Sequence, residues 1–130
     1  MKEMEDVLRG MTFEFFGRGS HKVTVEKLME AGGVLLDVRA AEEVAAVRLG
    51  LEGLLEVLHV PTCEIPDRLG EIPRDRPVGA FCSAGTRSAV VYAYLRAKGF
   101  ENARVVAGGY DCILPLVKPG KLLKRLEARP

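Results

Sequence analysis

The sequence predicts an α/β fold, a parallel five-stranded sheet with helices on both faces. Short apolar runs alternate along the chain with segments of helical periodicity, and prolines or glycines separate many of them. Runs such as residues 34–38 are apolar almost throughout instead of alternating, which is typical of parallel strands buried on both faces. The chain has 130 residues and no repeat or linker, so we expect one domain with a single core.

The N-terminal part divides into an extension and the start of the domain. Residues 1–20 are treated as an extension, in which residues 1–9 fit a short helix closed by a glycine. The domain is expected to span residues 21–130. It begins with a short strand at 21–23, and a threonine then provides an N-cap for a helix over residues 25–31, which two glycines end.

The next elements repeat the alternation of strand and helix. The buried strand 34–38 carries a carboxylate near its end, as expected where parallel strands open on a functional edge. Residues 40–48 suit a helix, and residues 54–60 contain the apolar content of a strand that is stopped by a proline. A short helix is predicted over residues 64–69.

The C-terminal half has the clearest sequence patterns for strands and helices. Residues 78–81 form a buried strand with small side chains. Residues 88–98 place apolar side chains three and four positions apart, the pattern of a helix packed on one face. A last strand is predicted at 104–106 and a terminal helix at 121–128.

Composition argues against several classes of partner. Nineteen Lys and Arg residues face eighteen Asp and Glu residues, giving a net charge of +1, and no basic run exceeds two residues. Neither a nucleic-acid-binding arm nor a polybasic membrane patch is predicted. The first residues lack the basic and apolar segments of an export signal, and no apolar run approaches the length of a membrane span. We therefore expect a cytoplasmic protein that binds neither nucleic acid nor membrane.

The cysteines do not predict a disulfide framework or a metal site. Cys63, Cys82 and Cys112 lie far apart and include no C-x-x-C pair. A zinc site would need nearly every Cys and His of the chain, without the usual close spacing of ligands. We expect no metal and no organic cofactor.

The segment that carries chemistry lies between the strand 78–81 and the helix 88–98. A loop of small residues at that junction can turn successive backbone N–H groups inward, and the positive end of the helix adds to their effect on an anion. A thiol at its base would be acidified and exposed as a reactive thiolate. The loop consists of Cys82, Ser83, Ala84, Gly85, Thr86, Arg87 and Ser88.

Two interpretations of this cysteine compete. Cys82 could simply be a small apolar residue that ends a core strand. A packing cysteine has no reason, however, to be followed by a glycine-containing loop, an arginine and a helix. We therefore interpret Cys82 as the nucleophile, with Gly85 free to adopt a left-handed conformation.

The loop resembles the active-site loop of the rhodanese-like sulfurtransferases, which consists of a Cys, four loop residues, an Arg and a Ser or Thr. Further matches occur in the same order along the chain and together cover residues 21 to 115. They are Asp37-Val38-Arg39, Glu43, His59-Val60-Pro61 and Gly108-Gly109.

The sequence departs from the family pattern at several places. Residues 50–58 lack the His and Pro of a family turn. Ile113 replaces an aromatic residue, and Tyr110 is a candidate for its packing role. Ser83 stands where many relatives carry Arg, so Arg87 is the only charged residue of the loop. This last difference argues against thiosulfate as the preferred donor.

The resemblance implies a sulfurtransferase of the thiosulfate sulfurtransferase type. Cys82 would take sulfane sulfur from a small donor, thiosulfate or a persulfide, and hold it as a persulfide. It would then pass the sulfur to a thiol or cyanide, or to an acceptor protein. Inward N–H groups would stabilise both anions without a general base. Arg87 would hold the loop, through a nearby carboxylate, and Asp37 and Arg39 would support the same edge as a scaffold.

Three other functions stay open from the sequence. Cysteine phosphatases also place a Cys-to-Arg loop at a helix N-terminus, but they need five residues between the two, whereas Cys82 and Arg87 have four between them. A Cys-His hydrolase would need His59 to reach Cys82. The third function is a non-catalytic module of the same family, serving interaction or regulation.

The other two thiols are expected to pack. Cys112 follows the Gly-Gly pair and could approach the same edge, where it would resolve the persulfide into a disulfide. We favour a buried packing role for both Cys63 and Cys112.

Overall fold

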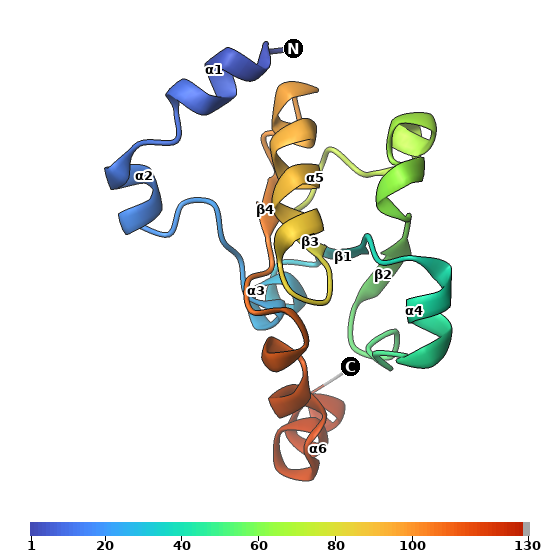
Figure 1. Ribbon diagram of the computed structural model, residues 1–130. Coiled ribbons are helices and arrows are strands. Elements are labelled where there is room, and N and C mark those ends of the chain that lie inside the picture. Colours follow the sequence, from blue (N-terminus) through green and yellow to red (C-terminus); the bar gives the residue numbers. More distant parts are fainter. Residues whose placement is uncertain (129–130) are drawn as a thin grey trace.

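The computed structural model describes residues 1–128 (Figure 1). Residues 129 and 130, the end of the expected domain, lie outside the described part. The α-helices are α1 (Met4–Arg9), α2 (Phe13–Gly17), α3 (Val25–Glu30), α4 (Ala41–Ala46), α5 (Thr86–Ala97) and α6 (Pro119–Glu127). The strands are β1 (Val34–Asp37), β2 (Glu56–His59), β3 (Val78–Phe81) and β4 (Ala103–Val105). Two short 3-10 helices lie between β2 and β3, namely η1 (Thr62–Glu64) and η2 (Pro66–Glu71). Two more lie between β4 and α6, namely η3 (Gly109–Cys112) and η4 (Leu114–Val117).

The four strands form one parallel sheet in the order β2-β1-β3-β4. The α/β class is thus confirmed, but the prediction of a fifth strand is wrong. Residues 21–23 make only an isolated parallel bridge, Lys22 to Val105, beside β4. The segment cannot extend this pairing because Thr24 caps α3 immediately afterwards, accepting a hydrogen bond from Lys27 N at 3.1 Å.

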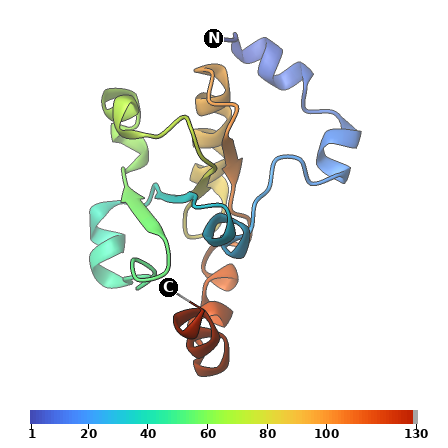
Figure 2. The same ribbon diagram turned by 180° about the vertical axis from the view of Figure 1, so that it is seen from behind.

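Helices cover both faces of the sheet, as predicted. Successive side chains of a strand point to opposite faces, and the two cores follow this alternation in β1. Leu36 packs with Val91 and Leu95 of α5. Leu35 packs on the other face with Leu28 of α3, which lies toward the reader in Figure 2. Both faces are apolar, which explains the uninterrupted apolar strands of the sequence.

Residues 1–20 form two helices beside the domain. The backbone N–H of Lys2 donates to the carbonyl of Ala97 at 2.8 Å, and Val7 is buried. Helix α1 therefore lies near the C-terminal end of α5 (Figure 1). No helix within residues 1–128 is long and apolar enough to cross a membrane.

Candidate active site

The strand, loop and helix predicted around Cys82 are present. Strand β3 ends at Phe81, Cys82 follows, and α5 begins at Thr86, two residues before the predicted start. Gly85 is the N-cap of α5 with φ +106°, a conformation that favours glycine. The turn brings the first amides of α5 back over the cysteine.

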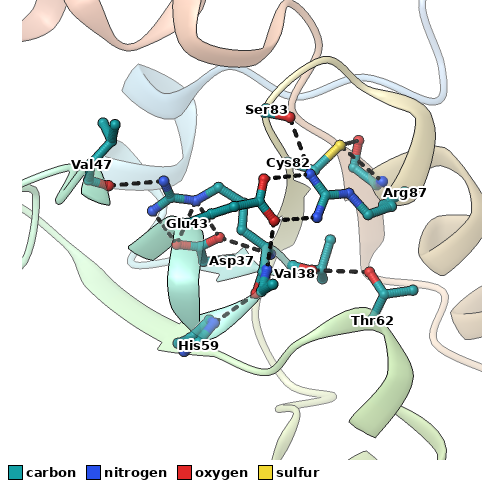
Figure 3. A network of polar contacts seen from close by, with 12 residues as sticks. Asp37, Val38, Glu43, Val47, His59, Thr62, Cys82, Ser83 and Arg87 are labelled. Atoms are coloured by element: carbon teal, nitrogen blue, oxygen red, sulfur yellow. Dashed lines mark hydrogen bonds and ion pairs between the residues drawn. The ribbon is translucent and has the colours of Figure 1, made fainter. Parts of the chain in front are cut away.

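The sulfur of Cys82 lies in a polar cup (Figure 3). Backbone N–H groups donate to Sγ from Gly85 at 3.1 Å and from Ser88 at 3.3 Å. The Cys82 thiol donates to Ser88 Oγ at 3.4 Å, and that hydroxyl donates to the Gly85 carbonyl at 3.0 Å. The amides therefore face the sulfur, as the sequence predicts for an anion-binding loop.

These contacts favour the thiolate form of Cys82. Burial raises the pKa of its thiol, but hydrogen bonds from the Ser88 hydroxyl and from the amides of Ser88, Ala84 and Gly85 lower it, and the net pKa is lowered. Proton loss also lets the Ser88 hydroxyl turn from the Gly85 carbonyl to the sulfur. The reactive form is thus stabilised by polar groups of the loop itself.

One expectation about this thiol is wrong. The loop pattern predicts an exposed thiolate, but Cys82 is only 2% exposed. The reason is the cup itself, since the loop closes over the sulfur while β3 and α5 pack around it. A donor therefore reaches the sulfur from the rim of the loop, where Ala84 and Thr86 are exposed.

Arg87 is held by a carboxylate, as expected, and that carboxylate is Glu43. The guanidinium binds both oxygens of Glu43, at 2.6 and 2.9 Å, and Nη2 also donates to Ser83 Oγ at 3.1 Å (Figure 3). The bidentate pair links the first turn of α5 to α4. The side chain of Arg87 is therefore engaged within the protein.

Glu43 has a second contact within α4. Its Oε2 accepts a hydrogen bond from the backbone N–H of Ala40 at 2.9 Å, so the same carboxylate caps the helix and binds Arg87. The hydrogen bonds from Arg87, followed by that from Ala40, lower the pKa of Glu43 to about 2. Glu43 is thus a stable anion beside the loop.

Asp37 and Arg39 form a buried ion pair at the end of β1. Arg39 is 0% and Asp37 2% exposed, and Arg39 Nη2 lies 2.8 Å from Asp37 Oδ2. Arg39 also donates to the Val47 carbonyl at 2.8 Å and to the Tyr110 hydroxyl at 3.1 Å. The hydrogen bond with Asp37 raises the pKa of Arg39 despite its burial. Such a fully hydrogen-bonded pair suits the scaffold role predicted for these two residues.

The segment after β4 packs directly against the loop. A Cβ on Gly109 would lie 2.0 Å from the carbonyl oxygen of Ser83, and the N–H of Tyr110 donates to that oxygen at 3.2 Å. The Tyr110 ring lies 6.1 Å from the ring of Phe81, consistent with the packing role considered for it. Tyr110 thereby connects the Arg39 ion pair to Ser83 of the loop.

His59 makes its polar contact elsewhere. Its Nε2 lies 2.7 Å from the carbonyl oxygen of Arg39, so this nitrogen must donate the hydrogen bond (Figure 3). His59 pairs with Asp37, which pairs in turn with Phe81 on the other side, and two strand spacings amount to about 10 Å. The structure therefore does not favour a Cys-His hydrolase.

The two remaining cysteines have different surroundings. Burial raises the pKa of Cys112, whose thiol donates to the Gly109 carbonyl at 3.0 Å. Cys112 packs with the α3 side of the sheet, as expected. The packing role expected for Cys63 is wrong, because Cys63 is exposed in the short 3-10 helix η1, none of whose residues is buried. Within residues 1–128, no three His, Cys, Asp or Glu side chains are grouped so as to hold a metal ion.

The site defines a class of protein. A thiol held by amides at the start of a helix, on the carboxyl edge of a parallel sheet, is typical of proteins whose cysteine acts as a nucleophile on anionic or sulfur-bearing groups. Residues 22–113 match the family of the rhodanese-like domain. The chain belongs to this family, and the resemblance predicted from the sequence is confirmed.

Named sulfurtransferases are among the relatives. The chain is 34% identical over 100 residues to a sulfurtransferase of Allochromatium vinosum, covering 72% of this chain and 88% of that protein. It is 31% identical over 84 residues to a tRNA sulfurtransferase of Aeromonas salmonicida, covering 65% of this chain. The match spans only 17% of the length of that larger relative.

Solved structures agree with the fold. A rhodanese-like domain protein from Staphylococcus aureus is 31% identical, with a TM-score of 0.58 over 70% of this chain and 88% of that chain. A human single-domain sulfurtransferase is 24% identical, with a TM-score of 0.64 over 77% of this chain and the whole of that chain. This second likeness concerns the fold alone.

Proposed function

We propose that this protein is a sulfurtransferase that carries sulfane sulfur as a persulfide on Cys82. The observation that carries the proposal is the pair of amide donors, Gly85 and Ser88, within 3.1 and 3.3 Å of Sγ. Membership of the rhodanese-like family and the relatives named sulfurtransferases support it.

In this reaction Cys82 is the nucleophile, and the backbone amides of the loop stabilise the charge on its sulfur. The Cys82 thiolate attacks the outer sulfur of a donor, an Sγ–S bond forms, and the donor's S–S bond breaks with its electron pair leaving on the donor. The persulfide anion lies further out than Sγ, within reach of the rim. Amides of the cup stabilise the charge before and after transfer, as in an oxyanion hole. A thiolate or cyanide then takes the outer sulfur and restores the Cys82 thiolate.

Two alternatives lose support in this geometry. The four residues between Cys82 and Arg87 enclose the sulfur closely, and Arg87 is bound to Glu43 instead of facing a phosphoryl group. A phosphatase is therefore disfavoured. A non-catalytic module has no need of the polar cup around Cys82.

Intact-protein mass spectrometry tests the proposal. The protein is incubated with thiosulfate, mercaptopyruvate or an organic persulfide. We expect a mass gain of one sulfur atom that cyanide or dithiothreitol reverses, and no such gain in Cys82→Ser. The matched control is Cys63→Ser, which removes an exposed thiol and should still be loaded. Absence of a gain with every donor would favour a binding module.

Thiosulfate as donor, and a small thiol, cyanide or an acceptor protein as recipient, belong to this proposal. The tRNA sulfurtransferases contain a matching segment within a much longer chain, so their substrate is not transferred to this protein.

A further inference from the structure

A cavity of about 510 Å³ opens at the edge of the sheet where β3 and β4 begin. Its lining comes from three parts of the chain: α3 with its flanking residues, the turn that precedes β3, and the start of β4. Cys82 follows the other end of β3, whose four residues span about 13 Å. No lining residue belongs to the Cys82 loop, so this cavity is separate from the site described above.

The lining is basic, although the whole chain carries a net charge of only +1. It contains four cations and a single carboxylate, Asp75. One of the cations, Arg76, is bound to Glu56 at 2.8 Å, so its charge is offset. The other three do not pair with any carboxylate within residues 1–128. They are Lys27, Arg74 and Arg104.

The two unpaired arginines are positioned by neutral groups. The guanidinium of Arg74 lies 3.8 Å from the ring centroid of Phe100. Arg104 Nη1 donates to the backbone carbonyls of Glu101 and Ala103, at 2.8 and 2.7 Å. A ring and two carbonyls hold these side chains in place without cancelling their positive charge.

Asn102 ties the parts of the lining together. Its Nδ2 donates to the carbonyls of Pro73 and Arg76, both at 2.8 Å, and so joins the turn before β3 to the start of β4. The neighbours of Arg104 in β4 pack in the core on the α5 side. Because side chains alternate along a strand, Arg104 points to the α3 side. The turn, the strand and the helix therefore present their cations to one cavity.

The chemistry of this lining favours a phosphorylated organic molecule. Guanidinium groups match the oxygens of a phosphate in pairs, and three uncompensated cations favour a ligand with several negative charges. The volume lies within the range of small-molecule sites, which combine such polar groups with apolar walls. The apolar part of this lining consists of Val23, Ala31 and Pro77.

We propose that the cavity binds a small organic polyphosphate of the size of a nucleotide. Its phosphates lie against Lys27, Arg74 and Arg104, and its organic part lies against Val23 and its apolar neighbours. The binding is non-covalent and does not depend on sulfur transfer, because the ligand and Cys82 are at opposite ends of β3.

Isothermal titration calorimetry of the full chain tests the proposal. The probes are ATP, pyrophosphate and adenosine, without magnesium so that the phosphates keep their charge. We expect ATP to bind more tightly than pyrophosphate, and adenosine to give no measurable binding. Added salt should weaken the binding of ATP, because the cations lie at the surface. Cys82→Ser should bind ATP as the wild type does.

Three substitutions change the charge of the lining. Lys27 and Asp75 are exposed, and neither side chain makes an ion pair or a hydrogen bond within residues 1–128, so their variants should fold. Lys27→Gln should weaken ATP binding roughly fivefold, and Asp75→Asn should tighten it roughly threefold. Arg104→Gln should weaken it roughly tenfold. The matched control is Lys121→Gln, an exposed lysine of α6 outside the cavity, which should leave the affinity unchanged.

Several outcomes would overturn the proposal. One is the absence of ATP binding at low ionic strength, and another is an affinity that none of the three lining variants changes. Equal affinity for pyrophosphate and ATP would show that the organic part is not recognised. A single-stranded oligonucleotide that binds more tightly than ATP would make the surface a nucleic-acid site instead.

The sulfurtransferase function is tested separately. Lys27→Gln should gain sulfur on Cys82 at the rate of the wild type, since the cavity lies at the other end of β3. Failure of every donor to load Cys82 would overturn sulfur transfer and leave the binding of ATP as it is. Slower loading in Lys27→Gln, but not in Lys121→Gln, would show that the two sites are not independent.

Discussion

Ser88 stabilises the thiolate of Cys82, the proposed nucleophile, in two ways. Its backbone N–H donates to Cys82 Sγ whatever the side chain, whereas its hydroxyl contributes only as long as the residue is Ser or Thr. The hydroxyl also satisfies the Gly85 carbonyl in the thiol form. A substitution at this position therefore separates the effect of a side chain from that of the helix start.

Ser88→Ala should raise the pKa of Cys82. The variant loses a hydrogen bond to the thiolate but keeps the two amide donors. The measurement is the rate of alkylation by iodoacetamide as a function of pH. We expect the variant to react more slowly than the wild type at neutral pH, and the two rates to converge at high pH.

Thr86→Ala is the control for this measurement. It removes a hydroxyl from the exposed first residue of α5, so its alkylation profile should match that of the wild type. An equal shift in both variants would mean that the helix N-terminus, not the Ser88 hydroxyl, sets the acidity.

The Glu43 carboxylate should make stability depend on acid pH. Its pKa is lowered from 4.5 to about 2 by Arg87 and Ala40. A lowered pKa in the folded state stabilises the fold above the ordinary pKa, and the effect is lost as pH falls toward the folded value. Since the pair is one-third exposed, its contribution should stay below about 1 kcal/mol.

Chemical denaturation of the wild type and Glu43→Gln at several pH values checks this expectation. The difference in free energy of unfolding should be largest near neutral pH and shrink as the pH falls below about 4. A difference that stays constant with pH would show that the pair contributes no net charge interaction.

At the scale of elements, the loop that follows Cys82 is held from two sides. Helix α4 holds it through Glu43 and Arg87, and the segment after β4 holds it through Gly109 and Tyr110. Both contacts join parts of the chain that are distant in sequence. The geometry around Cys82 therefore depends on the packing of elements that do not touch the sulfur.

Gly109→Ala should disturb the loop most directly. The added Cβ would lie 2.0 Å from the Ser83 carbonyl oxygen, and Gly109 has φ +54°. We expect a loss of about 2 kcal/mol or more in stability, and a large fall in sulfur loading of Cys82 in the fraction that stays folded.

Gly120→Ala is the matched control. No atom lies within 4 Å of a Cβ built at this position in α6, and alanine favours helix. Thermal unfolding and intact mass together compare the two variants. Wild-type loading in Gly109→Ala would mean that the contact with Ser83 does not position the loop.

The elements that the sequence predicts well are those fixed by local pattern. Strand β3, the loop and α5 combine a continuous apolar run, a glycine N-cap and helical spacing within twenty residues. The start of the sheet is predicted less well, because residues 21–23 look like a strand but have room for only one bridge before α3.

The contacts that complete the site depend on tertiary packing. Arg87 and Glu43 are 44 residues apart, and the sequence indicates only that some carboxylate is near. The approach of Gly109 to Ser83 and the near-complete burial of Cys82 also follow from how the elements meet. In the sequence, the Gly-Gly pair after the last strand is a match to the family pattern and does not indicate that it approaches Ser83.

At the scale of the whole molecule, the Cys82 loop and the N-terminal extension lie at opposite ends of α5. Its 12 residues span about 18 Å. Cys82 lies at its N-terminal end, and Lys2 of the extension binds the Ala97 carbonyl at the other. The extension should therefore contribute to the stability of the fold without affecting the rate of sulfur loading on Cys82.

Val7→Ala tests this separation. Val7 is 8% exposed, in a helix that packs on α5, so shortening its side chain should lower stability by about 1 kcal/mol. The rate of sulfur loading should not change, because the Cys82 loop is at the far end of α5.

Leu8→Ala is the control, since Leu8 lies on the same helix but is 58% exposed, and the stability of this variant should stay near that of the wild type. Thermal unfolding and the loading rate are measured on each protein. Slower loading in Val7→Ala alone would show that α1 affects the cup through α5, and the extension would then belong to the functional unit.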